Sequence, residues 1–190
     1  MTLEKHSLVR FAIDAKSSRL TVQAFASGFV SVLTHSPKFA IRNFVGEIVF
    51  HTEAMQNASV QLLVNVRSFE FTEEATNFDR KELQRLIHTQ VLDSNNISTV
   101  DYKSSRVSAT KMGDKMYRTS VLGDLNLHGI TRAVGFDAQV IVEDDAINAQ
   151  GSFPVMQSDF GLNIPSMAGG RLKFKDELKC EYNFIARRQP

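Results

Sequence analysis

The sequence contains few of the residues that build disulfides, metal sites or nucleic-acid interfaces. Cys180 is the only cysteine among 190 residues, which excludes an intramolecular disulfide and a cysteine-rich zinc site. The histidines, at positions 6, 35, 51, 88 and 128, form no i, i+2 or i, i+4 pair, so we predict no metal site. Basic and acidic residues number 22 and 21 without any block of like charge, so nucleic acid is not an expected partner.

Long apolar segments are also missing. No stretch reaches the ~18 continuous apolar residues that span a membrane as a helix, so we do not expect a membrane-spanning protein. The first ten residues lack the apolar run of a secretory signal. We therefore expect a cytoplasmic protein, or a periplasmic one if a signal preceded the sequence.

A complete catalytic constellation is absent as well. The carboxylate pairs Asp144-Asp145 and Asp176-Glu177 are flanked by turn residues and are expected to be solvated. Neither pair is accompanied by a base, a nucleophile or an oxyanion donor. We therefore predict no catalytic residue, no cofactor and no enzymatic activity. His88 is expected on the solvated face of a helix, and His128 in a turn.

What the sequence does contain is a regular alternation of polar and apolar residues. With 43% hydrophobic and 23% charged residues, the composition is that of a globular protein, and residues 1–190 are expected to form one domain. Residues 117–142 alternate in polarity as two long strands that turn back at His128-Gly129. The inward phase is predicted to contain Tyr117, Thr119, Val121, Leu125, Leu127, Val134, Phe136, Ala138, Val140 and Val142.

Most of the remaining chain also has the strand pattern. Further strands are predicted over residues 9–13, 19–25, 39–50, 60–66, 99–108, 147–155 and 178–186. Eight or nine strands with short connections indicate an all-β barrel or sandwich. The exception is residues 77–91, where Leu83, Leu86 and Ile87 share one helical face. This amphipathic helix is expected to cover the open end of a barrel.

Several motifs, taken together, resemble one known family. They are Phe11-Ala-Ile-Asp-Ala-Lys-Ser-Ser18, Phe44-Val-Gly-Glu-Ile48, Gly123-Asp-Leu-Asn-Leu-His-Gly-Ile-Thr-Arg-Ala-Val134, Ser158-Asp-Phe-Gly-Leu162 and Lys175-Asp-Glu-Leu178. In their order and spacing they resemble the YceI-like family over nearly the whole chain. The resemblance implies an eight-stranded, antiparallel, lipocalin-like β-barrel with one capping helix and a long apolar channel. It also implies that the ligand is an isoprenoid quinone, a polyprenyl phosphate or a fatty-acyl lipid.

Candidate ligand-contacting residues are those that the alternation of each strand places on the inner face of the barrel. A barrel of about eight strands either fills itself with side chains or holds one small ligand, and the small inward residues favour a ligand. The predicted channel lining consists of Leu20, Val22, Ala24, Leu62, Val64, Thr119, Val121, Phe136, Ala138, Cys180 and Tyr182. Cys180 is expected to act there as a small apolar residue.

A polar mouth and three hypotheses about function complete the expectations. His35, Arg171 and Lys173 are the candidate polar groups at the mouth of the channel. The leading hypothesis is a non-catalytic lipid-binding or carrier protein that copurifies with an isoprenoid or fatty-acyl lipid and forms a monomer or a homodimer. The first alternative is an enzyme that acts on an apolar substrate inside the barrel, with His35 or a carboxylate at the mouth as acid or base. The second is a filled barrel whose outer face binds a partner.

Overall fold

Alternating polarity produces long antiparallel strands in the computed structural model, which describes residues 8–27, 36–51, 54–72, 80–166 and 173–190. The strands are β1 (Leu8–Ile13), β2 (Arg19–Ser27), β3 (Lys38–Ile41), β4 (Phe44–His51), β5 (Ala54–Asn65), β6 (Phe69–Phe71), β7 (Thr99–Lys111), β8 (Met116–Leu127), β9 (Ile130–Val142), β10 (Ala146–Met156) and β11 (Lys173–Arg188). They are joined by the helix α1 (Arg80–Leu86), the π-helical turn η3 (Ile87–Val91) and the short 3-10 turns η2 (Val66–Ser68) and η4 (Ser158–Phe160). None of the described helices is long and apolar enough to cross a membrane.

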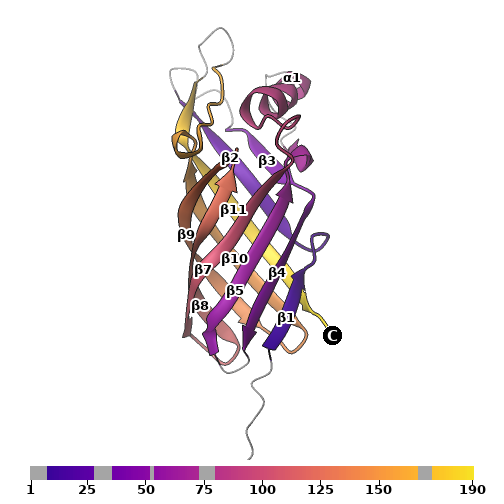
Figure 1. The fold of residues 1–190 in the computed structure, drawn as a ribbon, viewed down its shortest axis with the longest axis vertical. Helices are drawn as coiled ribbons and strands as arrows, with labels where there is room; N and C mark the ends of the chain where they lie inside the picture. The colour runs from indigo at the N-terminus through magenta and orange to yellow at the C-terminus, as the bar shows by residue number, and fades with distance from the viewer. Residues whose placement is uncertain (1–7, 28–35, 52–53, 73–79, 167–172) are drawn as a thin grey trace, which may run out of the picture.

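Eight of the strands close into an antiparallel barrel (Figure 1). Their order is β1-β4-β5-β7-β8-β9-β10-β11, and β11 closes the ring by pairing with β1 at Phe11↔Arg188 and Ile13↔Ala186. From Lys173 to Asn183, β11 pairs instead with β2, which continues the sheet through β3 to β6. The predicted eight-stranded barrel is therefore confirmed.

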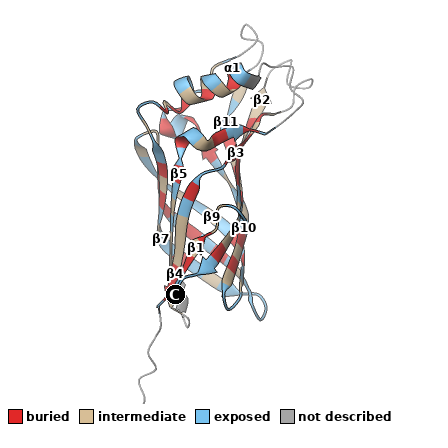
Figure 2. Ribbon diagram, turned by 90° about the vertical axis from the view of Figure 1, so that its right-hand side faces the viewer, coloured by how far each residue is buried: buried red, intermediate tan, exposed pale blue. Residues whose placement is uncertain are grey.

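The two long strands predicted at 117–142 are β8 and β9. They pair in one register from Met116↔Ile141 to Leu127↔Ile130, so His128 and Gly129 form a two-residue turn. Both turn residues have positive φ, +56° and +76°, as a type I′ hairpin requires. The predicted inward residues are buried or half-buried, and their neighbours Arg118, Ser120 and Gln139 are exposed. Figure 2 shows this alternation along the wall of the barrel.

One predicted strand is divided in the structure. The segment 39–50, expected to be a single strand, breaks at Arg42 and Asn43 into β3 and β4. The reason is a change of partner: β3 pairs with β2 and β6, whereas β4 pairs with β1 and β5. Local alternation is the same on both sides of such a break, so the sequence pattern does not reveal it.

The helical segment lies at one end of the barrel, as expected (Figure 1). It was predicted over 77–91; residues 77–79 lie outside the described ranges, and the helix is described from Arg80 to Val91. Leu83, Ile87 and Val91 are buried at a spacing of four residues. The segment ends in a π turn, in which the N–H of Leu92 donates to the carbonyl of Ile87.

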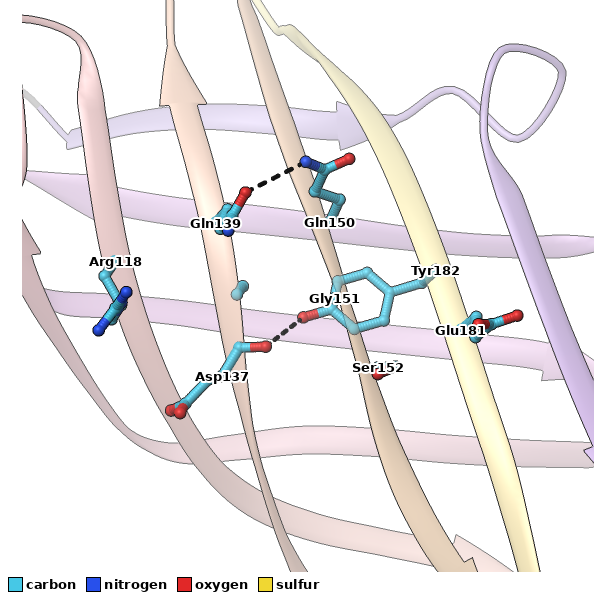
Figure 3. Close-up of a pocket in the computed structure, with 9 residues that line it drawn as sticks. Arg118, Asp137, Gln139, Gln150, Gly151, Ser152, Glu181 and Tyr182 are labelled. Atoms are coloured by element: carbon cyan, nitrogen blue, oxygen red, sulfur yellow. Dashed lines mark hydrogen bonds between the residues drawn. The ribbon is translucent and has the colours of Figure 1, made fainter.

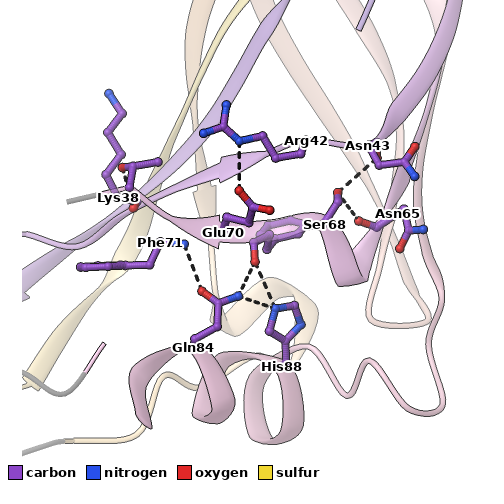
Figure 4. A network of polar contacts seen from close by, with 11 residues as sticks. Lys38, Arg42, Asn43, Asn65, Ser68, Glu70, Phe71, Gln84 and His88 are labelled. Carbon is purple, nitrogen blue, oxygen red and sulfur yellow. Dashed lines mark hydrogen bonds and ion pairs between the residues drawn. The ribbon is translucent and has the colours of Figure 1, made fainter. Parts of the chain in front are cut away.

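Polar contacts attach this segment to β6 (Figure 4). The side-chain oxygen of Gln84 accepts from the N–H of Phe71 at 3.0 Å, and its nitrogen donates to the carbonyl of Phe69. The Nε2 atom of His88 lies 3.1 Å from the same carbonyl oxygen. His88 is therefore half-buried, and the expectation that it is solvated was wrong. The helix supplies the partners that the short strand β6 lacks on this side.

A second segment at the same end follows β10. The Gln157 side chain is buried; its nitrogen donates to the carbonyl of Lys175 at 2.8 Å, and its oxygen accepts from the N–H of Ile164 at 3.0 Å. The Asp176 carboxylate accepts from the main chain and hydroxyl of Ser158, which lowers the pKa of Asp176. Asp176 was expected in a turn but lies in β11. These bonds hold residues 157–164 against β11.

Inside the barrel wall, two tyrosine rings each lie over a glycine of the neighbouring strand. The ring of Tyr102 lies over Gly123 of β8, and its hydroxyl donates to the carbonyl of Val134 on β9 at 3.2 Å. The ring of Tyr182 lies over Gly151 of β10, and its hydroxyl donates to the carbonyl of Asp137 on β9 at 3.2 Å. Glycine lets the strands bend and approach closely, and the aromatic ring fills the space above it.

We expect Gly123→Ala to destabilise the barrel by about 1–3 kcal/mol through overpacking. A Cβ atom at this position would lie 2.4 Å from the carbonyl oxygen of Lys103 and 2.7 Å from the Tyr102 ring. Gly135→Ala is the matched control, since its nearest neighbour would be a Leu122 methyl at 3.5 Å. Urea denaturation measures both variants. If Gly123→Ala and Gly135→Ala unfold with equal free energies, the close packing of the Tyr102 ring over Gly123 is contradicted.

We also expect Gln84→Ala to lower the free energy of unfolding by about 1–3 kcal/mol, because the N–H of Phe71 loses its side-chain partner. Gln90→Ala, at an exposed position of the same segment, is the control and should change stability by less than about 0.5 kcal/mol. Amide exchange of residues 80–92 should accelerate in Gln84→Ala alone. Unchanged exchange would show that these bonds do not hold the helix.

Candidate ligand-binding cavity

An apolar cavity of about 140 Å³ lies inside the barrel. Side chains of the strands and of both end segments line it: Ile13, Leu20, Val22, Ile41, Val60, Leu62, Val64, Phe69, Leu92, Val100, Tyr102, Leu125, Leu127, Phe136, Phe153, Val155, Leu162, Leu178, Cys180, Tyr182 and Phe184. Its volume is comparable to the engineered cavity of about 150 Å³ that stays dry and binds benzene. The interior is therefore hollow, but the void is small.

A chain of aromatic rings forms one boundary of this cavity. Phe136 is central: its ring centroid lies 5.4 Å from Tyr102, 5.0 Å from Phe153 and 5.5 Å from Tyr182. Phe184 continues the chain at 5.1 Å from Tyr182. These separations are typical of attractive aromatic pairs. The rings come from β7, β9, β10 and β11, so side chains of four strands meet in this chain.

Seven of the eleven residues predicted to line a channel do line the cavity. They are Leu20, Val22, Leu62, Val64, Phe136, Cys180 and Tyr182. Ala24, Thr119, Val121 and Ala138 are buried but do not line it. Along β9, Ala138 lies two residues beyond Phe136, and along β8, Thr119 and Val121 lie beyond Leu125.

Several lining residues were missed by the sequence reasoning. Tyr102 and Phe153 lie on predicted strands, and the alternation of those strands was the signal available for them. Leu92 follows the helical segment, Leu162 lies in the segment 157–164, and Phe69 lies in the short strand β6. None of these segments has a periodic pattern that indicates a contact with the interior. Their positions depend on the bonds of Gln84 and Gln157 described above.

The polar atoms that face the cavity have little capacity for chemistry. Desolvation raises the pKa of Tyr102 to about 12, with a smaller effect of the Asp124 charge, and raises the pKa of Tyr182 as well. Burial also raises the pKa of the Cys180 thiol to about 12, so it stays protonated and behaves as an apolar group. No cluster of three metal-ligating side chains occurs in the described ranges.

The residues predicted at a polar mouth are placed only in part. His35 and Arg171 lie outside the described residues. Lys173 is exposed at the beginning of β11, the end of that strand nearest the helical segment. On the outer wall further along β11, Glu181 pairs with Lys38 at 2.6 Å and Lys179 at 2.8 Å. Hydrogen bonds from Lys179 and then Lys38 lower the pKa of Glu181 to about 2.

Known structures share this architecture. BcnA of Burkholderia cenocepacia has a TM-score of 0.70 at 16% identity, over 91% of this chain and 98% of that one. A polyisoprenoid-binding domain from Saccharophagus degradans has a TM-score of 0.64 at 12% identity, over 94% and 98%. A YceI protein of Campylobacter jejuni has a TM-score of 0.57 at 10% identity, over 79% and 83%. At these identities the likeness establishes the fold.

Sequence comparison gives the family directly. No curated protein gave a significant sequence match. The model of the YceI-like domain, in contrast, matches residues 5–186, which is nearly the whole chain. Together with the closed eight-stranded barrel, this match shows that the chain belongs to the YceI-like family.

Proposed function

We propose that this protein binds or carries a long-chain amphiphile, with the apolar tail inside the barrel and without a catalytic step. The observation that carries the proposal is the cavity, whose lining is apolar apart from two tyrosine hydroxyls and one thiol. Those hydroxyls already donate to main-chain carbonyls. A ligand that needs only apolar contact and shape therefore suits this interior best.

Energetics favour a tail over a compact ligand. Each buried methylene contributes roughly 0.8 kcal/mol before the costs of association, so a long tail reaches useful affinity without a polar contact. The void of about 140 Å³ is smaller than the ~300–1,000 Å³ of ordinary ligand pockets. Binding a long tail thus requires apolar side chains or the end segments to move outward. Leu92 and Leu162 belong to those end segments and are the natural parts to yield.

The ligand class follows from chemistry and kinship together. Isoprenoid quinones, polyprenyl phosphates and fatty-acyl lipids all combine a flexible apolar tail with one polar head. The Saccharophagus degradans relative of the same fold is described as polyisoprenoid-binding, which supports an isoprenoid tail. The predicted polar mouth at His35, Arg171 and Lys173 stays part of this proposal.

We expect Val22→Phe to weaken binding of an isoprenoid probe, geranylgeraniol, at least tenfold. Val22 is half-buried and lines the cavity, so the larger ring occupies space that the tail needs. Val45→Phe is the matched control, because Val45 is 61% exposed on β4 and does not line the cavity. Fluorescence competition measures affinity, and thermal unfolding checks that both variants fold.

A wild-type protein that binds neither geranylgeraniol nor a fatty acid, and that releases no lipid into organic solvent, would contradict the proposed function. Binding that is equally strong in Val22→Phe would place the tail elsewhere on the molecule.

A further inference from the structure

The boundary between β9 and β10 is incompletely paired. β10 pairs with β11 along its whole length, from Ala146↔Arg187 to Met156↔Glu177. With β9 it pairs only from Ile147↔Val142 to Gln150↔Gln139. Beyond that point, residues 130–138 of β9 do not pair with residues 151–156 of β10. We call these two unpaired segments the seam. Part of the barrel wall is therefore not held by a main-chain ladder.

A side chain joins the strands where the ladder ends. The hydroxyl of Tyr182 reaches from β11 across β10 at Gly151 to the carbonyl of Asp137 on β9 (Figure 3). A Cβ atom on Gly151 would lie 2.5 Å from that carbonyl oxygen and 2.6 Å from the tyrosine hydroxyl. The hydroxyl thus takes the acceptor that a ladder bond would otherwise use. A rotating side chain can break such a bond without unfolding a strand.

A groove of about 490 Å³ lies on the outer side of the seam. Its lining consists of Arg118, Asp137, Ala138, Gln139, Gln150, Gly151, Ser152, Glu181 and Tyr182. Tyr182 lines this groove and also the inner cavity. The exposed polar groove and the apolar cavity are therefore separated at this point by one aromatic side chain, which is itself 7% exposed.

The groove offers hydrogen-bond donors beside two carboxylates, those of Asp137 and Glu181. The Arg118 side chain makes no hydrogen bond or ion pair within the described ranges, so its guanidinium is available, and Gln150 and Ser152 add further donors. The Asp137 carboxylate accepts from Ser120, and Glu181 is paired with two lysines. Asp137 has no cation partner among the described residues and disfavours a phosphate by like-charge repulsion, whereas a neutral carbonyl accepts from the donors.

We propose that the seam is a lateral portal through the barrel wall, and that its outer groove receives the neutral, carbonyl-bearing head of an amphiphile whose tail lies in the cavity. A quinone is the head group that fits this description among the three ligand classes. The inference rests on the proposed function, since it needs a tail in the barrel. It adds a second route besides the end covered by the helix.

A reversible crosslink tests the portal. Gln139 and Gln150 are the last register partners before the seam, so the pair Gln139→Cys/Gln150→Cys can form a disulfide that pins the two strands there. We expect the oxidised form to release a quinone with a geranylgeranyl tail at least tenfold more slowly, and reduction to restore the rate. The register pair Gln61→Cys/Lys103→Cys, on the continuous β5–β7 ladder, is the control and should not change the rate.

The head group is tested with two probes that share the same tail. Wild-type protein should bind the geranylgeranyl quinone more tightly than geranylgeranyl monophosphate. Arg118→Ala should weaken quinone binding about tenfold, whereas Arg106→Ala, at an exposed position on β7, should leave it unchanged. Equal or tighter binding of the phosphate overturns the head-group assignment.

Different results would contradict the portal and the proposed function. If the wild type binds both probes but neither the crosslink nor Arg118→Ala has an effect, the portal is wrong and the proposed function stands. If the wild type binds neither probe, the proposed function fails, and the portal fails with it. Thermal unfolding of each variant shows whether an effect comes from a misfolded barrel.

Discussion

Closure of the sheet by β11 is the constraint on which the interior of this protein depends. β11 is sixteen residues long and pairs with β10 on one side. On its other side it pairs with β2 from Lys173 to Asn183 and with β1 from Ala186 to Arg188. A shorter strand would leave an open edge and an exposed apolar face. Because the ring is closed, the inward side chains of eight strands face one another and enclose an apolar volume.

The curvature of that ring creates a second requirement, which glycine and tyrosine meet together. Gly123 and Gly151 allow the strands to bend, and Tyr102 and Tyr182 cover them from inside. Both hydroxyls satisfy carbonyls of β9, and burial keeps them protonated. The same residues thus shape the wall, form one boundary of the cavity and, at Gly151, stand where the ladder between β9 and β10 ends.

Such an interior recognises ligands without directional chemistry. Apolar contact is roughly proportional to buried area, so tail length and shape decide affinity inside the barrel. Discrimination between head groups has to come from polar groups at the surface, where few side chains can contact the ligand. In the portal that we propose, the guanidinium of Arg118 beside the carboxylates of Asp137 and Glu181 is an arrangement of that kind.

Much of the architecture could be predicted because strand alternation is a local property. Each inward residue of 117–142 follows from a period of two, and the turn at His128-Gly129 follows from backbone preferences. The break of 39–50 into β3 and β4 could not be predicted in the same way. It results from a change of partner strand, which involves residues distant in sequence.

The sequence by itself determined the all-β class, the faces of the long strands, the position of the helical segment and the apolar character of the interior. These depend on periodicity and composition, which neighbouring residues set. Only the tertiary structure decided that Phe136 lines the cavity whereas Thr119, Val121 and Ala138, although buried, do not. It also decided that Tyr182 contacts both the cavity and the outer groove. Alternation says which way a side chain points, but the space left between side chains depends on how rings from different strands meet across the closed barrel.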